Sequence, residues 1–238
     1  MEVQIQDNLL KILDNIKKIE QKNNRKEGSV KLCAVSKFHP AESVIEALKG
    51  GQTLFGENRV QEACSKFEYI NQVVEDKKLA KPNLHIIGVL QSNKVKKAVE
   101  IANCIQSVDR IELLLEIEKR CTAIDKNIDV FLELHTAEDS KAGFADETSL
   151  IKACEEAALL KFPHIRISGL MTMAPFTEDL SAIIKSFSTL RKLKERLNID
   201  FPNLPITELS MGMSGDYESA IAEGSTMVRI GTAIFGNR

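Results

Sequence analysis

The sequence has no tryptophan, and aromatic residues make up only 5% of its 238 positions. This scarcity gives no support to base stacking, on which many proteins that bind single-stranded nucleic acid rely. An excess of positive charge is also missing, because 32 Lys and Arg residues face 34 Asp and Glu residues, for a net charge of −2. Proteins that bind nucleic acid or anionic membrane surfaces usually carry a basic patch or segment. We therefore expect no nucleic-acid partner and no membrane partner.

Long apolar runs are absent as well. No run approaches the roughly 20 residues of a membrane-spanning helix, and the polar N-terminus does not resemble a signal peptide. The five cysteines are scattered and form no CxxC pair; they are Cys33, Cys64, Cys104, Cys121 and Cys154. This pattern is typical of reduced thiols that mostly serve in packing. We therefore expect a cytoplasmic location.

Several sequence motifs of known chemistry are missing too. Without GxGxxG or GxxxxGK[ST], the sequence favours neither a dinucleotide-binding fold nor a P-loop NTPase. The histidines have no HxH or HExxH spacing, so we predict no metal site.

What the chain does contain, from Val30 onwards, is a regular alternation of short apolar runs and helical patterns. The eight runs are Val30–Val35, Thr53–Phe55, Leu84–Ile87, Cys104–Val108, Val130–Leu134, Ile165–Met171, Thr207–Leu209 and Met227–Ile230. The helical patterns lie at roughly 41–49, 58–76, 92–101, 110–125, 146–159, 178–196 and 216–223. This order predicts a parallel sheet covered by helices. Eight units match a single (β/α)8 TIM barrel, although an open sheet stays possible because the second and seventh runs are short.

We predict one domain over residues 1–238. An extra N-terminal helix is expected within residues 1–28, where apolar residues recur at a helical period, and the barrel within residues 30–236. No long linker rich in Pro, Gly or Ser divides the chain, and we expect no second β domain.

Lys37 directly follows the first predicted strand, before Pro40 opens a helix. In strand alternation it shares a face with Cys33 and Val35, which directs it to the C-terminal mouth of the barrel. A partly desolvated lysine can attack a carbonyl group. A lysine that merely extends into solvent is the alternative interpretation of this segment taken alone.

The loops after the last two strands suit an anion, and TIM barrels frequently bind phosphate there. Glycines for close backbone approach and hydroxyl donors occur at Gly212, Gly215, Gly231, Ser210 and Thr232. Arg229 has the strand parity to reach the same mouth. A phosphorylated aldehyde held as a Schiff base on Lys37 would use all these groups. A Schiff-base aldolase is an alternative, with Glu57 or Asp109 as acid or base, although we interpret both carboxylates as cap or surface residues.

Several segments resemble the pyridoxal-phosphate homeostasis protein family, whose barrel is similar to that of alanine-racemase-type (fold type III) enzymes. The matching segments are Ala34–Lys37, Phe55–Glu62, His85–Gly88, Leu90–Lys94, Gly169–Ala174, Leu209–Ser214 and Val228–Gly236. They occur in the family's order from about Val30 to Gly236.

The resemblance implies a pyridoxal 5'-phosphate cofactor and assigns residues to it. Lys37 matches the Schiff-base lysine, Arg229 the arginine at the pyridine nitrogen, Asn58 an asparagine beside the cofactor, and Ser210, Gly231 and Thr232 the phosphate binders. His135 departs from the family, in which asparagine is expected after the fifth strand, and this puts the local pocket lining in doubt.

An arginine cannot readily give the pyridine nitrogen a proton, so the ring would be a poor electron sink. Racemases of this type use a tyrosine from an additional β domain, whereas this sequence ends at Arg238 and has only Tyr69 and Tyr217. We therefore expect a monomeric, non-catalytic protein that binds pyridoxal phosphate and acts in intracellular vitamin B6 and amino-acid homeostasis, with apo-enzymes as transient acceptors. A small pyridoxal-phosphate-dependent amino-acid racemase, with Tyr217 or water as second base, is the alternative.

Overall fold

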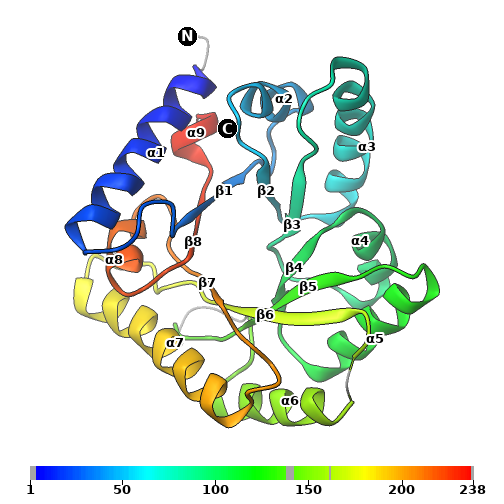
Figure 1. Ribbon diagram of the computed structural model, residues 1–238, viewed down its shortest axis with the longest axis vertical. Helices are drawn as coiled ribbons and strands as arrows, with labels where there is room; N and C mark the ends of the chain where they lie inside the picture. Colours follow the sequence, from blue (N-terminus) through cyan, green and yellow to red (C-terminus); the bar gives the residue numbers. More distant parts are fainter. Residues whose placement is uncertain (1–3, 138–141, 161, 237–238) are drawn as a thin grey trace.

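The computed structural model describes residues 4–137, 142–160 and 162–236. Its strands pair in parallel and in chain order, and they close into a barrel ringed by helices (Figure 1). The strands are β1 (Lys31–Val35), β2 (Leu54–Glu57), β3 (Asn83–Ile86), β4 (Cys104–Val108), β5 (Ile128–Glu133), β6 (Ile165–Met171), β7 (Glu208–Ser210) and β8 (Met227–Ile230). The predicted TIM barrel is confirmed, and the open sheet is excluded because β8 pairs with β1 from Lys31↔Met227 to Ala34↔Ile230.

A helical segment follows every strand, as predicted for the first seven, and the short helix after β8 was not predicted. The helices are α1 (Ile5–Lys22), α2 (Ala41–Lys49), α3 (Val60–Lys77), the 3-10 turn η1 (Ser92–Lys94), α4 (Val95–Ile101), α5 (Ile111–Ala123), α6 (Glu147–Leu160), α7 (Leu180–Asp200), α8 (Tyr217–Ala222) and α9 (Thr232–Phe235). None of the helices in the described part of the chain has the length and apolar character to cross a membrane.

The extra N-terminal helix is α1, which is shorter than the predicted 1–28, and residues 1–3 lie outside the described residues. Its buried apolar residues recur every three or four positions, at Ile5, Leu9, Ile12, Ile16 and Ile19. This face packs beside α8 and α9 at the seam between the last and first units (Figure 1). Near the end of α1, the buried Glu20 accepts hydrogen bonds from the backbone N–H groups of Gly28 and Val30, at 3.0 and 2.8 Å. These bonds fix how the chain enters β1.

The inside of the barrel is filled by side chains. A buried cluster there consists of Cys33, Leu54, Cys104, Phe131, Met171 and Met227, separate from the larger core between strands and helices. Packing is tight at Gly56, where a Cβ atom would come within 2.9 Å of Cys33 Sγ. The filled interior divides the barrel into two separate mouths, at the C-terminal and N-terminal ends of the strands.

Two strands run further at their C-terminal ends than predicted, because polar residues extend them. β2 continues to Gly56 and Glu57, which pair with His85 and Ile86, and β7 continues to Ser210. The interpretation of Glu57 as a cap or surface residue is wrong, since its side chain is fully buried and forms an ion pair with Lys66 at 2.9 Å.

Candidate functional site

A cavity of about 200 Å³ opens at the C-terminal mouth of the barrel. It is lined by Val35, Lys37, His39, Asn58, Ile87, Met173, Met213, Ser214, Arg229, Gly231 and Thr232. Five of the six residues assigned to a cofactor from the sequence are therefore brought together around one space. The sixth, Ser210, does not line this cavity and lies fully buried behind Arg229.

Lys37 stands in a turn and not in a strand. β1 ends at Val35, and the backbone N–H of His39 donates to the Ser36 carbonyl at 3.1 Å. Strand alternation therefore does not determine where Lys37 points, although the turn still places it in the cavity lining.

A buried polar network holds the residues on either side of Lys37. Ser36 donates its hydroxyl to Glu57 Oε1 at 2.7 Å, and its carbonyl accepts from Lys66 Nζ at 2.9 Å. Lys66 Nζ also contacts Glu57 Oε1 at 2.9 Å and Glu62 Oε1 at 3.0 Å. The same Glu62 oxygen accepts from the backbone N–H of Phe38 at 2.7 Å. The backbone before and after Lys37 is thus anchored to α3.

The turn also contains a sterically unusual residue. Phe38 has φ of +66°, in the left-handed region that non-glycine residues seldom adopt. Besides its bond to Glu62, Phe38 lies against Arg59, whose guanidinium carbon is 5.1 Å from the ring centroid. Such backbone conformations persist only where the surroundings enforce them, and they are frequent at functional sites.

Arg229 is the buried cation of the cavity, with 5% of its surface exposed. Its Nη1 donates to the Ser210 carbonyl at 2.7 Å and to the Ser210 hydroxyl at 2.8 Å, and its Nη2 donates to the Thr172 carbonyl at 2.9 Å. These bonds occupy three of its five N–H groups and fix the guanidinium plane. Ser210 in turn donates its hydroxyl to Gln106 Oε1 at 2.6 Å, inside the barrel. Ser210 therefore orients Arg229.

Two carboxyl groups, on the buried Glu133 and the half-buried Asp216, act electrostatically on Arg229. Burial raises the pKa of Glu133 to about 7, while the nearby Arg229 opposes this rise and Asp109 adds to it. Burial also raises the pKa of Asp216, which accepts a hydrogen bond from the backbone N–H of Met213 at 2.5 Å. Burial lowers the pKa of Arg229 itself, against the effect of these carboxyl groups.

One end of the cavity offers small residues and hydroxyl groups. Gly231 sits against β1, where a Cβ atom would meet the Val35 carbonyl oxygen at 3.0 Å. Thr232 begins the short α9, so the first backbone N–H groups of that turn have no intrahelical acceptor. Ser214 adds a second hydroxyl from the loop after β7. This chemistry suits an anionic group. Among the described residues, no group of three or more His, Cys, Asp and Glu side chains is arranged to hold a metal ion.

Comparisons with known proteins agree with this fold. The family model described as "Alanine racemase, N-terminal domain" matches residues 8–238. The pyridoxal phosphate homeostasis protein of Pasteurella multocida is 39% identical over 235 residues, which cover 98% of this chain and 97% of that protein. The protein of the same name from Aquifex aeolicus is 37% identical with the same coverage.

Solved structures give the same result. PipY of Synechococcus elongatus, solved with PLP bound, is 33% identical with a TM-score of 0.83, covering 98% of this chain and all of that one. This chain belongs to the pyridoxal phosphate homeostasis protein family. Alanine racemase from Clostridium difficile shares the fold at 16% identity and a TM-score of 0.69, and the match takes up 57% of that chain.

Within this family's barrel, the sequence analysis missed two polar residues of the cavity, Ser214 and His39. Ser214 belongs to a matching segment, but only Ser210 was chosen from it. The signal that separates them is position, because Ser210 is the last residue of a buried strand and Ser214 lies in the exposed loop. His39 could be found from its place in the turn after β1, two residues beyond Lys37.

The doubt about His135 is resolved by its position. Its Nε2 contacts the carbonyl oxygen of Ala137, and it does not line the cavity. Neither tyrosine lines the cavity either. Tyr69 is 47% exposed on α3, and the Tyr217 hydroxyl accepts a hydrogen bond from Asn15 of α1.

Proposed function

We propose that this protein holds pyridoxal 5'-phosphate as a Schiff base on Lys37 and serves intracellular pyridoxal-phosphate and amino-acid homeostasis without catalytic turnover. The observation that carries the proposal is the meeting of Lys37, Arg229, Gly231 and Thr232 around one cavity. When bound, the cofactor supplies an aldehyde that an amine can capture and a ring that can accept electron density.

The residues of the cavity fit such a group. Asn58 Oδ1 is buried and has no hydrogen-bond partner in the structure, so a ligand with a donor would satisfy it. Ser214, Thr232 and the first N–H groups of α9 would bind the phosphate, with Gly231 leaving room for close approach. Ser210, in contrast, would act through Arg229 rather than on the phosphate.

Arg229 supports binding without turnover. We infer that its guanidinium faces the pyridine nitrogen, held there by Ser210 and Thr172. A guanidinium stays protonated and gives up its proton far less readily than a carboxylic acid. The ring nitrogen would therefore remain unprotonated, which disfavours the removal of a proton from a bound amino acid.

The alternative of a small amino-acid racemase needs a second acid or base opposite the lysine. Tyr217 is poorly placed for this role because its hydroxyl is turned to α1. His39 lines the cavity and is the described titratable side chain that a racemase could use there in addition to Lys37. If the protein only binds the cofactor, His39 is a lining residue without a role in proton transfer. Its ring contacts that of Phe235, with 5.1 Å between the ring centroids.

We further propose that the protein works as a monomer in the cytoplasm and passes the cofactor to apo-enzymes. The hydrogen bonds that hold the turn around Lys37 would keep the lysine in place to accept the cofactor. The open C-terminal mouth of the barrel would let the cofactor leave.

The test is to incubate the cofactor-loaded protein with L- and D-amino acids in deuterated water and to follow the α-proton by NMR. We expect cofactor absorption that is lost in Lys37→Ala, together with exchange no faster than that of free pyridoxal phosphate. Rapid exchange that disappears in Lys37→Ala or His39→Phe would establish the racemase instead. A protein that gains no visible absorption on addition of pyridoxal phosphate would refute both.

A further inference from the structure

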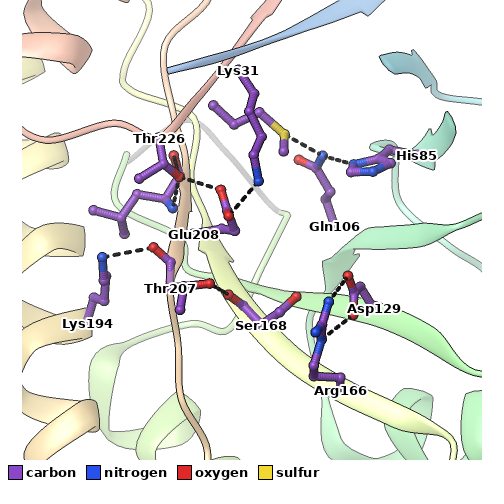
Figure 2. A network of polar contacts seen from close by, with 12 residues as sticks. Lys31, His85, Gln106, Asp129, Arg166, Ser168, Lys194, Thr207, Glu208 and Thr226 are labelled. Carbon is purple, nitrogen blue, oxygen red and sulfur yellow. Dashed lines mark hydrogen bonds and ion pairs between the residues drawn. The ribbon is translucent and has the colours of Figure 1, made fainter. Parts of the chain in front are cut away.

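The N-terminal mouth of the barrel contains a cavity larger than the one around Lys37, at about 520 Å³. Its polar lining comes from the starts of the strands and the loops before them, and its floor is formed by side chains of the barrel interior. The polar residues are Lys31, Gln52, Thr53, Asn83, His85, Asp129, Arg166, Ser168, Thr207 and Glu208. Figure 2 shows polar residues of this region, including Gln106, Lys194 and Thr226 beside the lining.

Charges of both signs stand around this cavity. Lys31 Nζ contacts Glu208 Oε1 at 2.7 Å, and Arg166 forms two bonds to Asp129, at 2.6 and 2.7 Å. The four side chains come from β1, β7, β6 and β5, and Figure 2 shows the two pairs on different sides of the same space. Their charges sum to zero. A ligand that is itself neutral overall but carries both charges would match them best.

A hydrogen-bond donor is also directed at this mouth. His85 is 6% exposed, and burial lowers its pKa to about 4, so the ring is neutral near pH 7. Gln106 accepts from Ser210 through Oε1, so its Nε2 is the donor to His85 Nδ1 at 2.7 Å. The proton of the neutral ring must then be on Nε2. No contact of this nitrogen with another described residue is seen, which leaves it as a donor at the cavity.

Ser168 provides a second polar group without a partner. Its side chain is buried, with the residue 5% exposed, and its hydroxyl has no hydrogen-bond partner, while its carbonyl accepts from the Thr207 backbone N–H at 3.0 Å. Ser168 lines the cavity, and the strand is irregular here, because the pairing of β5 and β6 shifts register between Val130 and Phe131. A buried hydroxyl without a partner is costly and indicates a group that a ligand satisfies.

From these observations we infer that the N-terminal mouth binds a small zwitterion with the chemistry of a free α-amino acid. Its carboxylate would accept from His85 Nε2 and the Ser168 hydroxyl on the side of Arg166. Its ammonium group would lie on the opposite side, near Glu208. An apolar side chain would face Leu54, Phe131 and Met227, which complete the lining. This site is separate from the proposed cofactor site and does not depend on it.

The experiment is isothermal titration calorimetry of the full chain without cofactor, so that amino acid cannot react with pyridoxal phosphate. L-leucine is the probe, compared with 4-methylpentanoate, which lacks its ammonium group, and 3-methylbutylamine, which lacks its carboxylate. We expect saturable heat for L-leucine and at least tenfold weaker binding of the other two. No saturable heat with L-leucine up to about 10 mM, or equal binding of either analogue, would overturn the inference.

Two matched serine variants locate the site. Ser168→Ala removes a hydroxyl that has no partner in the structure, so the fold should be unaffected while L-leucine binding weakens by about tenfold or more. Ser214→Ala, at the other mouth, should leave L-leucine binding unchanged. Pyridoxal-phosphate titrations should show the reverse pattern, with weaker binding only in Ser214→Ala. Unchanged L-leucine binding in Ser168→Ala would place the amino acid elsewhere and refute the assignment.

Discussion

The two mouths of this barrel hold similar residue types in different arrangements. At the C-terminal mouth the cation Arg229 is bound to neutral oxygens of Ser210 and Thr172, with the carboxyl groups of Glu133 and Asp216 nearby but not in contact with it. At the N-terminal mouth the two cations of the lining are each paired directly with a carboxylate, Lys31 with Glu208 and Arg166 with Asp129. A buried cation bonded only to neutral groups keeps its charge available to a ligand, whereas paired charges offer a balanced surface. Because their cations are bonded differently, the C-terminal mouth suits an anion and the N-terminal mouth suits a zwitterion.

A hydrogen-bond chain joins the two mouths through the filled interior. It runs from Arg229 to the Ser210 hydroxyl, to Gln106 and to His85, and each member donates to the next. The two mouths are therefore separate as cavities but share one polar connection, and their ionisable groups respond to pH in opposite ways.

The largest predicted effect is this opposite pH dependence of stability. The Glu133 pKa of about 7 in the folded protein lies above its ordinary value of 4.5, so its contribution to stability is present below pH 4.5 and is lost as pH rises through 7. Buried His85, with a folded pKa of about 4 against 6.5, contributes stability above pH 6.5 that is lost as pH falls toward 4. Each contribution is on the order of 3 kcal/mol.

Urea unfolding of the cofactor-free protein between pH 4.5 and 8 measures both contributions. Relative to the parent, Glu133→Gln should gain stability as pH rises, and His85→Gln should gain stability as pH falls. If the free energy of unfolding of both variants changes with pH as that of the parent does, Glu133 and His85 do not give the two mouths opposite pH dependences.

A smaller effect is predicted for a matched pair of buried serines. Ser210→Ala should lower the free energy of unfolding by about 1–3 kcal/mol, because it leaves Gln106 Oε1 without its donor and removes one acceptor of Arg229. Ser168→Ala should leave it unchanged or raise it, because the buried hydroxyl that it removes has no partner. Equal losses in the two variants, measured by urea unfolding at pH 7, would contradict this distinction.

The smallest predicted effect concerns the exposed hydroxyl of the cofactor cavity. Ser214→Ala should weaken pyridoxal-phosphate binding by roughly tenfold, the usual value of a hydrogen bond to a charged group, with no change in stability. Absorption titration gives the affinity and unfolding gives the stability, with Ser188→Ala on α7, outside the cavity lining, as control. If Ser214→Ala lowers the free energy of unfolding but leaves the affinity for pyridoxal phosphate unchanged, Ser214 has only a structural role.

Much of the fold could be predicted because it depends on local patterns. Apolar runs separated by helical periods predict eight units, and each run after Val30 corresponds to a strand of the barrel. The ends of β2 and β7 could not be predicted, because Glu57 and Ser210 are polar and become buried only through partners on other elements. For Glu57 the partner is Lys66, on the helix that follows.

The two mouths also differed in how far they could be predicted. The residues around Lys37 lie in contiguous motifs, so matching them brought five of six residues to one cavity. The N-terminal mouth has no motif, since Lys31 and Glu208 are 177 positions apart and each is a single charge at the start of a strand. Only closure of the barrel brings them together.

The most direct test of the central claim is borohydride reduction of the protein with bound pyridoxal phosphate, followed by peptide mass mapping. Reduction converts a Schiff base into a stable phosphopyridoxyl group on the lysine that formed it. We predict this group on Lys37 and on no other lysine, including Lys31 at the opposite mouth. A phosphopyridoxyl group on Lys31, on Lys66 or on any lysine other than Lys37 would contradict it.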